Sequence, residues 1–182
     1  TPYNGTATFT DGTTTTVIDG IRAVMEQLHD DDNDEVYDGG AHGGGIAAVY
    51  DCNLEVTNSI INNNQIISEG CFGGGIYSSG SLVLTNVLIS GNKILNSYEA
   101  YGGGIYCSGN LTLLNITMTN NIVDGNYYNG GGIYCKNSST SLENMTISNN
   151  STGSDGYGGG IYVHNSTTIL NNIDLDNNIS DH

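Results

Sequence analysis

The sequence predicts an all-β protein, a right-handed parallel β-helix with one three-stranded coil per repeat of 28 to 30 residues. A Gly-Gly-Gly-Ile phrase recurs five times at that spacing, and a fixed period of this length is typical of solenoids whose repeats stack to bury their apolar faces. Between the phrases, short stretches alternate apolar and polar residues, as strands with one buried face do. The five triplets are Gly43–Gly45, Gly73–Gly75, Gly102–Gly104, Gly130–Gly132 and Gly158–Gly160.

The first 42 residues are expected to form lead-in strands with an acidic insertion, and residues 43–182 a single continuous five-coil β-helix. Because the chain begins at Thr1, we expect a processed mature protein or a segment of a longer one. Ile21–His29 has helical propensity, and it is interpreted either as a short capping helix or as an irregular strand. The sequence leaves open whether this region forms another coil, a cap or an extended arm.

Each repeat is expected to contain three short strands. In the clearest repeat these are Ile105–Cys107, Leu111–Leu113 and Ile116–Met118. Length varies only in the link between the first two strands and in the segment that follows the repeat's second Asn. The triplet suits a tight corner where a Cβ would clash or where φ is positive. The right-handed sense rests on the general preference of parallel crossovers.

Two Asn positions recur in every repeat, one at a bend between strands and one at a strand end. Asn tolerates the left-handed region, and stacked amides can pass hydrogen bonds from coil to coil. These structural ladders hold Asn58, Asn86, Asn115, Asn144 and Asn172 at the bend, and Asn64, Asn92, Asn121, Asn150 and Asn178 at the strand end.

The charge balance is strongly acidic, with three Lys and Arg residues against 19 carboxylates and a formal net charge of -16. This balance argues against nucleic acid and anionic membrane surfaces, which need clustered cations. No apolar run is long enough to insert directly into a membrane. We expect a secreted or cell-surface protein in a cation-rich setting.

An acidic run before the first triplet is the strongest local charge feature. Asp30, Asp32 and Asp34 have the alternate spacing that opens calcium-binding loops, and Asp38 follows them. The match then fails, because Glu35 stands where such loops have Gly. The run is therefore interpreted as a solvated insertion loop or as a calcium site, calcium being the one cofactor the sequence suggests.

Tyrosines form the second candidate site. The repeated Tyr77, Tyr106, Tyr134 and Tyr162 predict an outward stack that stabilises neighbouring coils. The variable loops before the triplets suit recognition of a ligand, because solenoids place binding residues on such edges. The candidate ligand-binding residues in these loops are Tyr98, Tyr101, Tyr127, Tyr128 and Tyr157.

The cysteines are expected to pack rather than to react. Cys107 and Cys135 follow the Ile-Tyr pair in successive repeats and should stack inward. A bridge between Cys52 and Cys71 is an alternative that spacing alone does not decide.

The sequence argues against an enzyme. A β-helix lyase needs a basic residue beside an acidic sugar, but Arg22, Lys93 and Lys136 fall at unrelated positions of the repeat. A hydrolase needs carboxylates that face each other across a groove. Asp174 and Asp176 point outward together, but nothing acidic is expected to stack above them, since Glu143 is one position out of step.

The Gly-Gly-Gly-Ile phrase followed by apolar-x-x-Asn resembles the paired repeat of the chlamydial polymorphic outer membrane proteins, in which the motifs are Gly-Gly-Ala-Ile and Phe-x-x-Asn. It is also similar to the repeats of large adhesin-like surface proteins. The resemblance covers residues 43–182 well, and it departs in the third Gly and in aliphatic residues in place of Phe. It implies secretion, surface display and adhesion, with no catalytic residues to transfer.

Two non-enzymatic functions follow as hypotheses. The first is an adhesin-like or structural protein of the cell surface that binds surface glycans or proteins. The second is a filament subunit whose partner is itself, because the open ends of a β-helix can stack end to end. A polysaccharide-binding or polysaccharide-degrading β-helix is the less favoured alternative.

Overall fold

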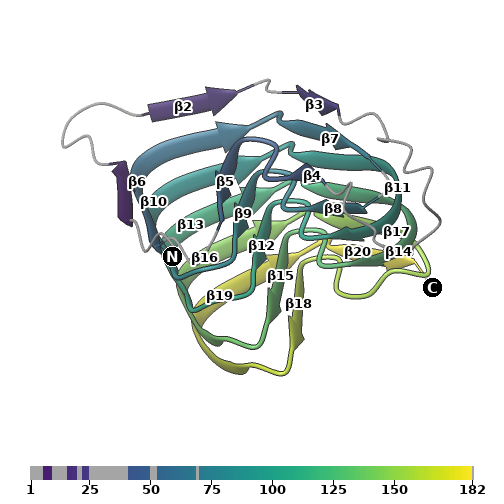
Figure 1. Cartoon of the computed structure of the whole chain (residues 1–182). Coiled ribbons are helices and arrows are strands. Elements are labelled where there is room, and N and C mark those ends of the chain that lie inside the picture. Colours follow the sequence, from purple (N-terminus) through teal and green to yellow (C-terminus); the bar gives the residue numbers. More distant parts are fainter. Residues whose placement is uncertain are drawn as a thin grey trace.

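The computed structural model describes residues 6–9, 16–19, 22–24, 41–49, 53–68 and 70–181. Their strands form three parallel sheets, which wind as a β-solenoid (Figure 1). The strands of successive coils pair with one another, and between β10, β13, β16 and β19 the paired residues lie 28 or 29 apart along the chain. The prediction of an all-β parallel solenoid is confirmed.

Sheet A has the longest strands. The strands β6, β10, β13, β16 and β19 stack in that order, with β1 and β2 beyond β6. Their bounds are Asn53–Asn62, Leu82–Ser90, Leu111–Thr119, Ser139–Ser148, Thr167–Asp176, Thr6–Phe9 and Thr16–Asp19.

Sheet B follows sheet A in each coil. Its strands are β3 (Arg22–Val24), β4 (Ala41–His42), β7 (Gln65–Ile67), β8 (Gly70–Phe72), β11 (Lys93–Tyr101), β14 (Ile122–Asn129), β17 (Ser151–Ser154) and β20 (Ile179–Asp181).

Sheet C closes the coil after the Gly corner. Its strands are β5 (Ile46–Ala48), β9 (Ile76–Ser78), β12 (Ile105–Cys107), β15 (Ile133–Lys136) and β18 (Ile161–His164).

The coil has three strands, but they are divided differently from the expectation. The stretches Leu111–Leu113 and Ile116–Met118 belong to one bent strand, β13, because the left-handed Asn115 turns the backbone without ending the pairing. The segment after the second Asn, expected to be a variable link, supplies the strand of sheet B. This segment forms a strand, although its sequence is irregular, because its backbone pairs with the same segment of the neighbouring coil.

The region before the first triplet contributes strands to the same sheets. β1 and β2 pair with β6, and β3 pairs with β7, all in parallel. Of the two interpretations of Ile21–His29, the strand holds for the described residues Arg22–Val24. The acidic run Asp30 to Asp38 and Cys52 lie outside the described residues.

The strand-end Asn residues form a continuous ladder inside the solenoid. The Oδ1 of Asn121 accepts hydrogen bonds from the backbone N and the Nδ2 of Asn92, at 3.1 and 2.9 Å. Its Nδ2 donates to Asn150 Oδ1 at 2.9 Å and to the Ile89 carbonyl at 3.0 Å. The ladder therefore satisfies buried amides that would otherwise be costly. The same pattern joins Asn64, Asn92, Asn121, Asn150 and Asn178.

The bend Asn residues form a second ladder on the outer surface. Their φ values lie between 49° and 56°, in the region that Asn tolerates better than most residues. Asn115 Nδ2 donates to Asn86 Oδ1 at 3.0 Å, and Asn144 Nδ2 donates to Asn115 Oδ1 at 3.2 Å. In this outer ladder each Asn Nδ2 donates to the Asn of the preceding coil. In the inner ladder each Asn Nδ2 donates to the Asn of the following coil.

The Gly corners join sheet B to sheet C. The first Gly of each triplet has a φ between 67° and 73°. A Cβ on the second Gly would lie 2.2 to 2.4 Å from a backbone oxygen of the next coil, as Gly103 would from Gly131 O. The corner therefore needs one Gly for its backbone angle and another for the close approach of adjacent coils.

The core lies in two parts. The larger part fills the space between sheets A and C, with the side chains of Leu84, Ile89, Leu113 and Ile133 among the fully buried ones. A smaller cluster under sheet B consists of Ile66, Cys71, Ile94, Ala100, Val123 and Tyr128. Cys107 and Cys135 pair in register in sheet C and are fully buried.

Candidate functional site

The outer face of sheet B carries the most exposed aromatic side chains. β11 presents Tyr98, β14 presents Tyr127, and Tyr157 follows β17. Their side chains are 53%, 57% and 55% exposed. Because strands rather than loose loops hold Tyr98 and Tyr127, their backbone positions are set by the pairing of successive coils.

Tyr98 and Tyr127 lie together although they belong to different coils. Their ring centroids are 5.3 Å apart, at an interplanar angle of 69°. This edge-to-face arrangement is favourable for aromatic pairs. Tyr157 lies nearer the corner, with its ring 6.5 Å from that of Tyr162.

Three exposed carboxylates lie on, or directly after, the strands that carry these rings. Glu99 stands beside Tyr98 on β11 and pairs in register with Tyr127. Asp124 lies on β14 with Oδ1 3.5 Å from the position that a Cβ on Gly153 would take, and Asp155 follows β17. We call Tyr98, Glu99, Asp124, Tyr127 and Asp155 the tyrosine–carboxylate face.

Tyr128 does not belong to the exposed surface, which corrects its place among the expected loop residues. It pairs with the inward Ala100, and its side chain is 1% exposed. Its hydroxyl is buried without a hydrogen-bond partner. Burial, and then the charges of Asp124 and Asp155, raise the pKa of Tyr128. The two carboxylates therefore act on the same ring from neighbouring coils.

The reversal of Tyr128 has a local cause. Ile94 pairs with Val123, but Ser97 pairs with Gly125, so the register of β11 and β14 shifts between these pairs. Such a shift breaks the alternation of inward and outward side chains. Tyr128 faces inward five residues after the inward Val123, a separation at which simple alternation predicts the opposite face.

Tyr101 serves a structural role at the corner. Its ring stacks on Phe72, with centroids 5.5 Å apart, and lies 4.8 Å from the ring of Tyr134. Burial, and then the charge of Glu99, raise the pKa of Tyr101. Tyr101 is thus a partly buried member of an aromatic band rather than part of the exposed pair.

The stacked tyrosines of sheet C form the other row of that band. The rings of Tyr77, Tyr106, Tyr134 and Tyr162 follow one another at 5.2 to 5.4 Å, with interplanar angles of 5° to 10°. The stack lies outside the core, yet Tyr106 and Tyr134 are nearly buried, because Phe72 and Tyr101 cover them. Ring faces that cover each other are unavailable to a ligand.

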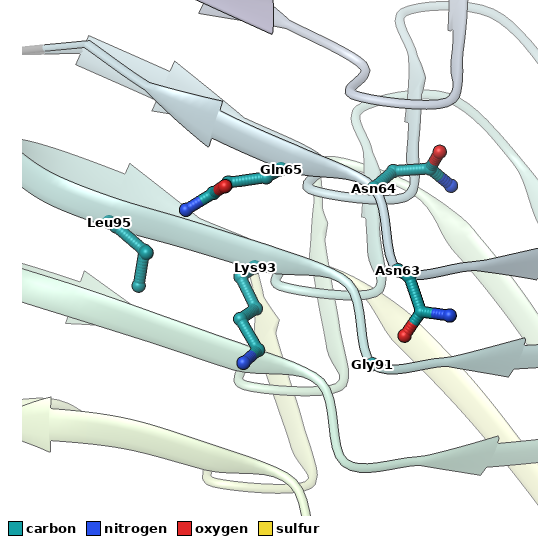
Figure 2. A pocket seen from close by; sticks show the side chains of 6 residues that line it. All are labelled: Asn63, Asn64, Gln65, Gly91, Lys93 and Leu95. Carbon is teal, nitrogen blue, oxygen red and sulfur yellow. The ribbon is translucent and has the colours of Figure 1, made fainter. Parts of the chain in front are cut away.

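One hollow lies on the outer surface at the junction of sheets A and B (Figure 2). It is a shallow, open depression of about 200 Å³. In Figure 2 the side chains of Gln65 and Lys93 lie on one side, and Asn64 points away from them. Lys93 is its single cation, on a chain whose net charge of -16 repels anions. Its lining residues are Asn63, Asn64, Gln65, Gly91, Lys93 and Leu95.

The expected calcium ligands Asp30, Asp32, Asp34 and Asp38 fall outside the described residues. In the ranges that the structure does describe, no three His, Cys, Asp or Glu side chains gather as a metal site.

The outward carboxylates of sheet A are arranged as follows. Asp174 pairs in register with Thr146, and Asp176 pairs with Ser148. Glu143 pairs with Asn171, whose Nδ2 donates to its Oε1 at 3.5 Å. Neither Asp therefore has an acidic partner in the preceding coil.

Sequence reasoning missed Glu99, and it placed Asp124 and Asp155 in the variable loops without counting them among the ligand-binding residues. Glu99, Asp124 and Asp155 come from three coils; Glu99 stands in register with Tyr127, and Asp124 and Asp155 act on the adjacent Tyr128. The signal available in the sequence was weak: Glu99 and Asp155 both stand three residues before a Gly triplet, but Asp124 stands six residues before its triplet. Among the described residues, no helix is long and apolar enough to cross a membrane.

The repeat of the Chlamydia polymorphic membrane proteins matches residues 115–136 and 144–164. Each match runs from a bend Asn through an inner-ladder Asn and a Gly corner to a strand of sheet C. The matched motif is thus the structural unit of the coil. Comparison with curated proteins gives no significant match, and comparison with solved structures gives none either.

Proposed function

We propose that this chain, a β-helix protein with repeats of the Chlamydia polymorphic membrane protein type, is a non-enzymatic, adhesin-like module displayed at a cell surface. The observation that carries the proposal is the exposed row of Tyr98, Tyr127 and Tyr157 on the outer face of sheet B. Tyrosines at rigid exposed positions supply large contact area at low entropic cost, which is why binding surfaces are enriched in them. The ligands we expect are surface glycans or proteins.

Binding of the labelled chain to a printed panel of glycans and immobilised extracellular proteins tests this proposal. We expect at least one ligand to be bound, and the triple variant Tyr98→Ser, Tyr127→Ser, Tyr157→Ser to lose that binding by about tenfold or more. The matched control is Ile169→Ser with Ile179→Ser, which removes exposed apolar side chains elsewhere. Binding that survives in the triple variant, or no binding to any ligand, would refute an adhesin that uses this row.

A second candidate function is head-to-tail self-assembly. β18, β19 and β20 each lie at the end of their sheet, and the inward-register Leu170 and Leu175 of β19 are 55% and 56% exposed. Their counterparts Leu142 and Ile147 in the preceding coil are fully buried. An open edge with exposed inward side chains favours the addition of further strands.

Light scattering of the purified 182-residue chain across a range of concentrations tests the second candidate. We expect assemblies that Leu170→Lys with Leu175→Lys abolishes, because stacking of a further coil would bury these two inward positions and a buried unpaired charge is costly. Ile169→Lys is the control, since Ile169 lies outward on the same strand and is 64% exposed. A monomer at every concentration would rule the second candidate out.

A further inference from the structure

The tyrosine–carboxylate face combines aromatic rings with negative charge, and its five defining residues include no cation. The chain has three Lys and Arg residues in all. Lys93 is exposed at the start of β11, five residues before Tyr98, and Lys136 has its Nζ 5.7 Å from the ring centroid of Tyr106, over sheet C.

The rings are placed where a ligand can reach them. Tyr98 and Tyr127 meet edge to face and remain more than half exposed. They differ in this from the tyrosines of sheet C, whose rings cover one another at 5.2 to 5.4 Å. An exposed tyrosine face attracts a cation through the negative charge of its π system.

The carboxylates are fixed relative to the rings by the sheet. Glu99 stands in register with Tyr127, and Asp124 packs against Gly153 of the next coil. Asp124 and Asp155 both act on the buried Tyr128 between them. Glu99 thus borders the exposed pair of rings, and Asp124 and Asp155 lie around the neighbouring Tyr128. Three carboxylates from three coils on one stretch of sheet suit a ligand with several positive charges along its length.

We propose that the tyrosine–carboxylate face binds a cationic, arginine- and lysine-rich segment of a partner protein; this inference rests on the adhesin-like function proposed above. Guanidinium groups stack on the exposed rings, and Glu99, Asp124 and Asp155 pair with neighbouring cations. The net charge of -16 raises the rate of encounter with such a segment. Arginine is favoured over lysine, because its planar, weakly hydrated group stacks better on aromatic rings.

Binding of a fluorescent decaarginine peptide to the full chain, measured by anisotropy at physiological salt, tests the inference. The key comparison is between two triple variants that change the net charge equally. Glu99→Gln, Asp124→Asn, Asp155→Asn neutralises the proposed face, whereas Glu55→Gln, Glu143→Gln, Asp174→Asn neutralises exposed carboxylates of sheet A. We expect the first to weaken binding at least about tenfold and the second less than about threefold.

The rings are tested separately with Tyr98→Leu and Tyr127→Leu, which keep an apolar side chain but remove the π face. We expect this pair to weaken decaarginine binding more than decalysine binding, because the stacking of guanidinium is lost. If the two triple carboxylate variants lost decaarginine affinity equally, the interaction would be nonspecific charge attraction, and the inference would be overturned. Binding of neutral glycans at the same tyrosines without decaarginine binding would also overturn it, while the proposed adhesin function would stand.

Discussion

At the scale of single residues, asparagine side chains link each coil to the next through two ladders of hydrogen bonds. The same residue type fills two different roles because its side chain both tolerates a left-handed backbone and carries a donor and an acceptor. At the bend, Asn115 uses the first property, with a φ of 56°. In the interior, Asn121 uses the second, and every polar atom of its amide finds a partner.

Asn121→Leu should destabilise the fold by about 3 kcal/mol or more. The change leaves the Ile89 carbonyl and the amides of Asn92 and Asn150 with unmade hydrogen bonds in the interior, and each buried unsatisfied group costs about 1–3 kcal/mol. Urea unfolding followed by circular dichroism measures the loss.

Asn115→Gly is the matched control for that experiment. It removes an amide from the exposed ladder but keeps a residue that adopts positive φ readily. We expect a loss of about 1 kcal/mol or less. Equal losses in the two variants would contradict the claim that the inner ladder is the energetically important one.

At the scale of elements, the Gly corner sets the spacing of the coils. The amides of the triplet donate to the corner of the next coil, as Gly103 N does to Gly130 O at 3.0 Å. This contact brings two backbones so close that a side chain does not fit between them. The Gly corner, like the Asn ladder, therefore sets the distance between adjacent coils.

Gly103→Ala should destabilise the fold by about 3 kcal/mol or more, because its Cβ would lie 2.4 Å from Gly131 O, a backbone atom that moves only with its coil. Gly153→Ala serves as the control, since its nearest atom is Tyr128 Cε2 at 3.3 Å. Thermal unfolding should show a much larger fall in Tm for the first variant. A similar fall in both would mean that the corner relaxes easily.

At the scale of the whole molecule, buried tyrosine and cysteine side chains that stay protonated in the folded chain should make the free energy of unfolding fall at alkaline pH. Burial raises the pKa of Tyr106 and Tyr134 to about 12, and that of Cys107 to about 11. The unfolded chain loses these protons from its ordinary pKa of about 9 to 10 upward, so it binds fewer protons than the folded chain. The stabilisation is therefore complete below about pH 9 and is lost as the pH rises toward 12.

Urea midpoints measured at pH 8, 10 and 11 should fall in that order, and Tyr134→Phe should flatten the dependence by removing one of the titrating groups. A midpoint that stays level across this range would contradict the burial of the tyrosine stack. Cys107 and Cys135 should also react slowly with thiol reagents at pH 8, because the thiolate is the reactive form.

The sequence by itself determined the period, the all-β parallel solenoid and the residues that repeat in it. These features are readable because each coil stacks like residues on like, so the physical demands of a coil appear as a repeat. A left-handed bend favours Asn at positions such as Asn115, and a close backbone approach requires Gly at positions such as Gly103.

Only the tertiary structure decided which residues of the variable segment face outward. The register shift between β11 and β14 turns Tyr128 into the core, while Tyr98 and Tyr127 come together from different coils. The placement of Glu99 beside Tyr127, and of Asp124 and Asp155 near Tyr128, has the same origin. The direction of each side chain depends on pairing with a strand 28 or 29 residues away, and an irregular segment carries no alternation from which that pairing can be read.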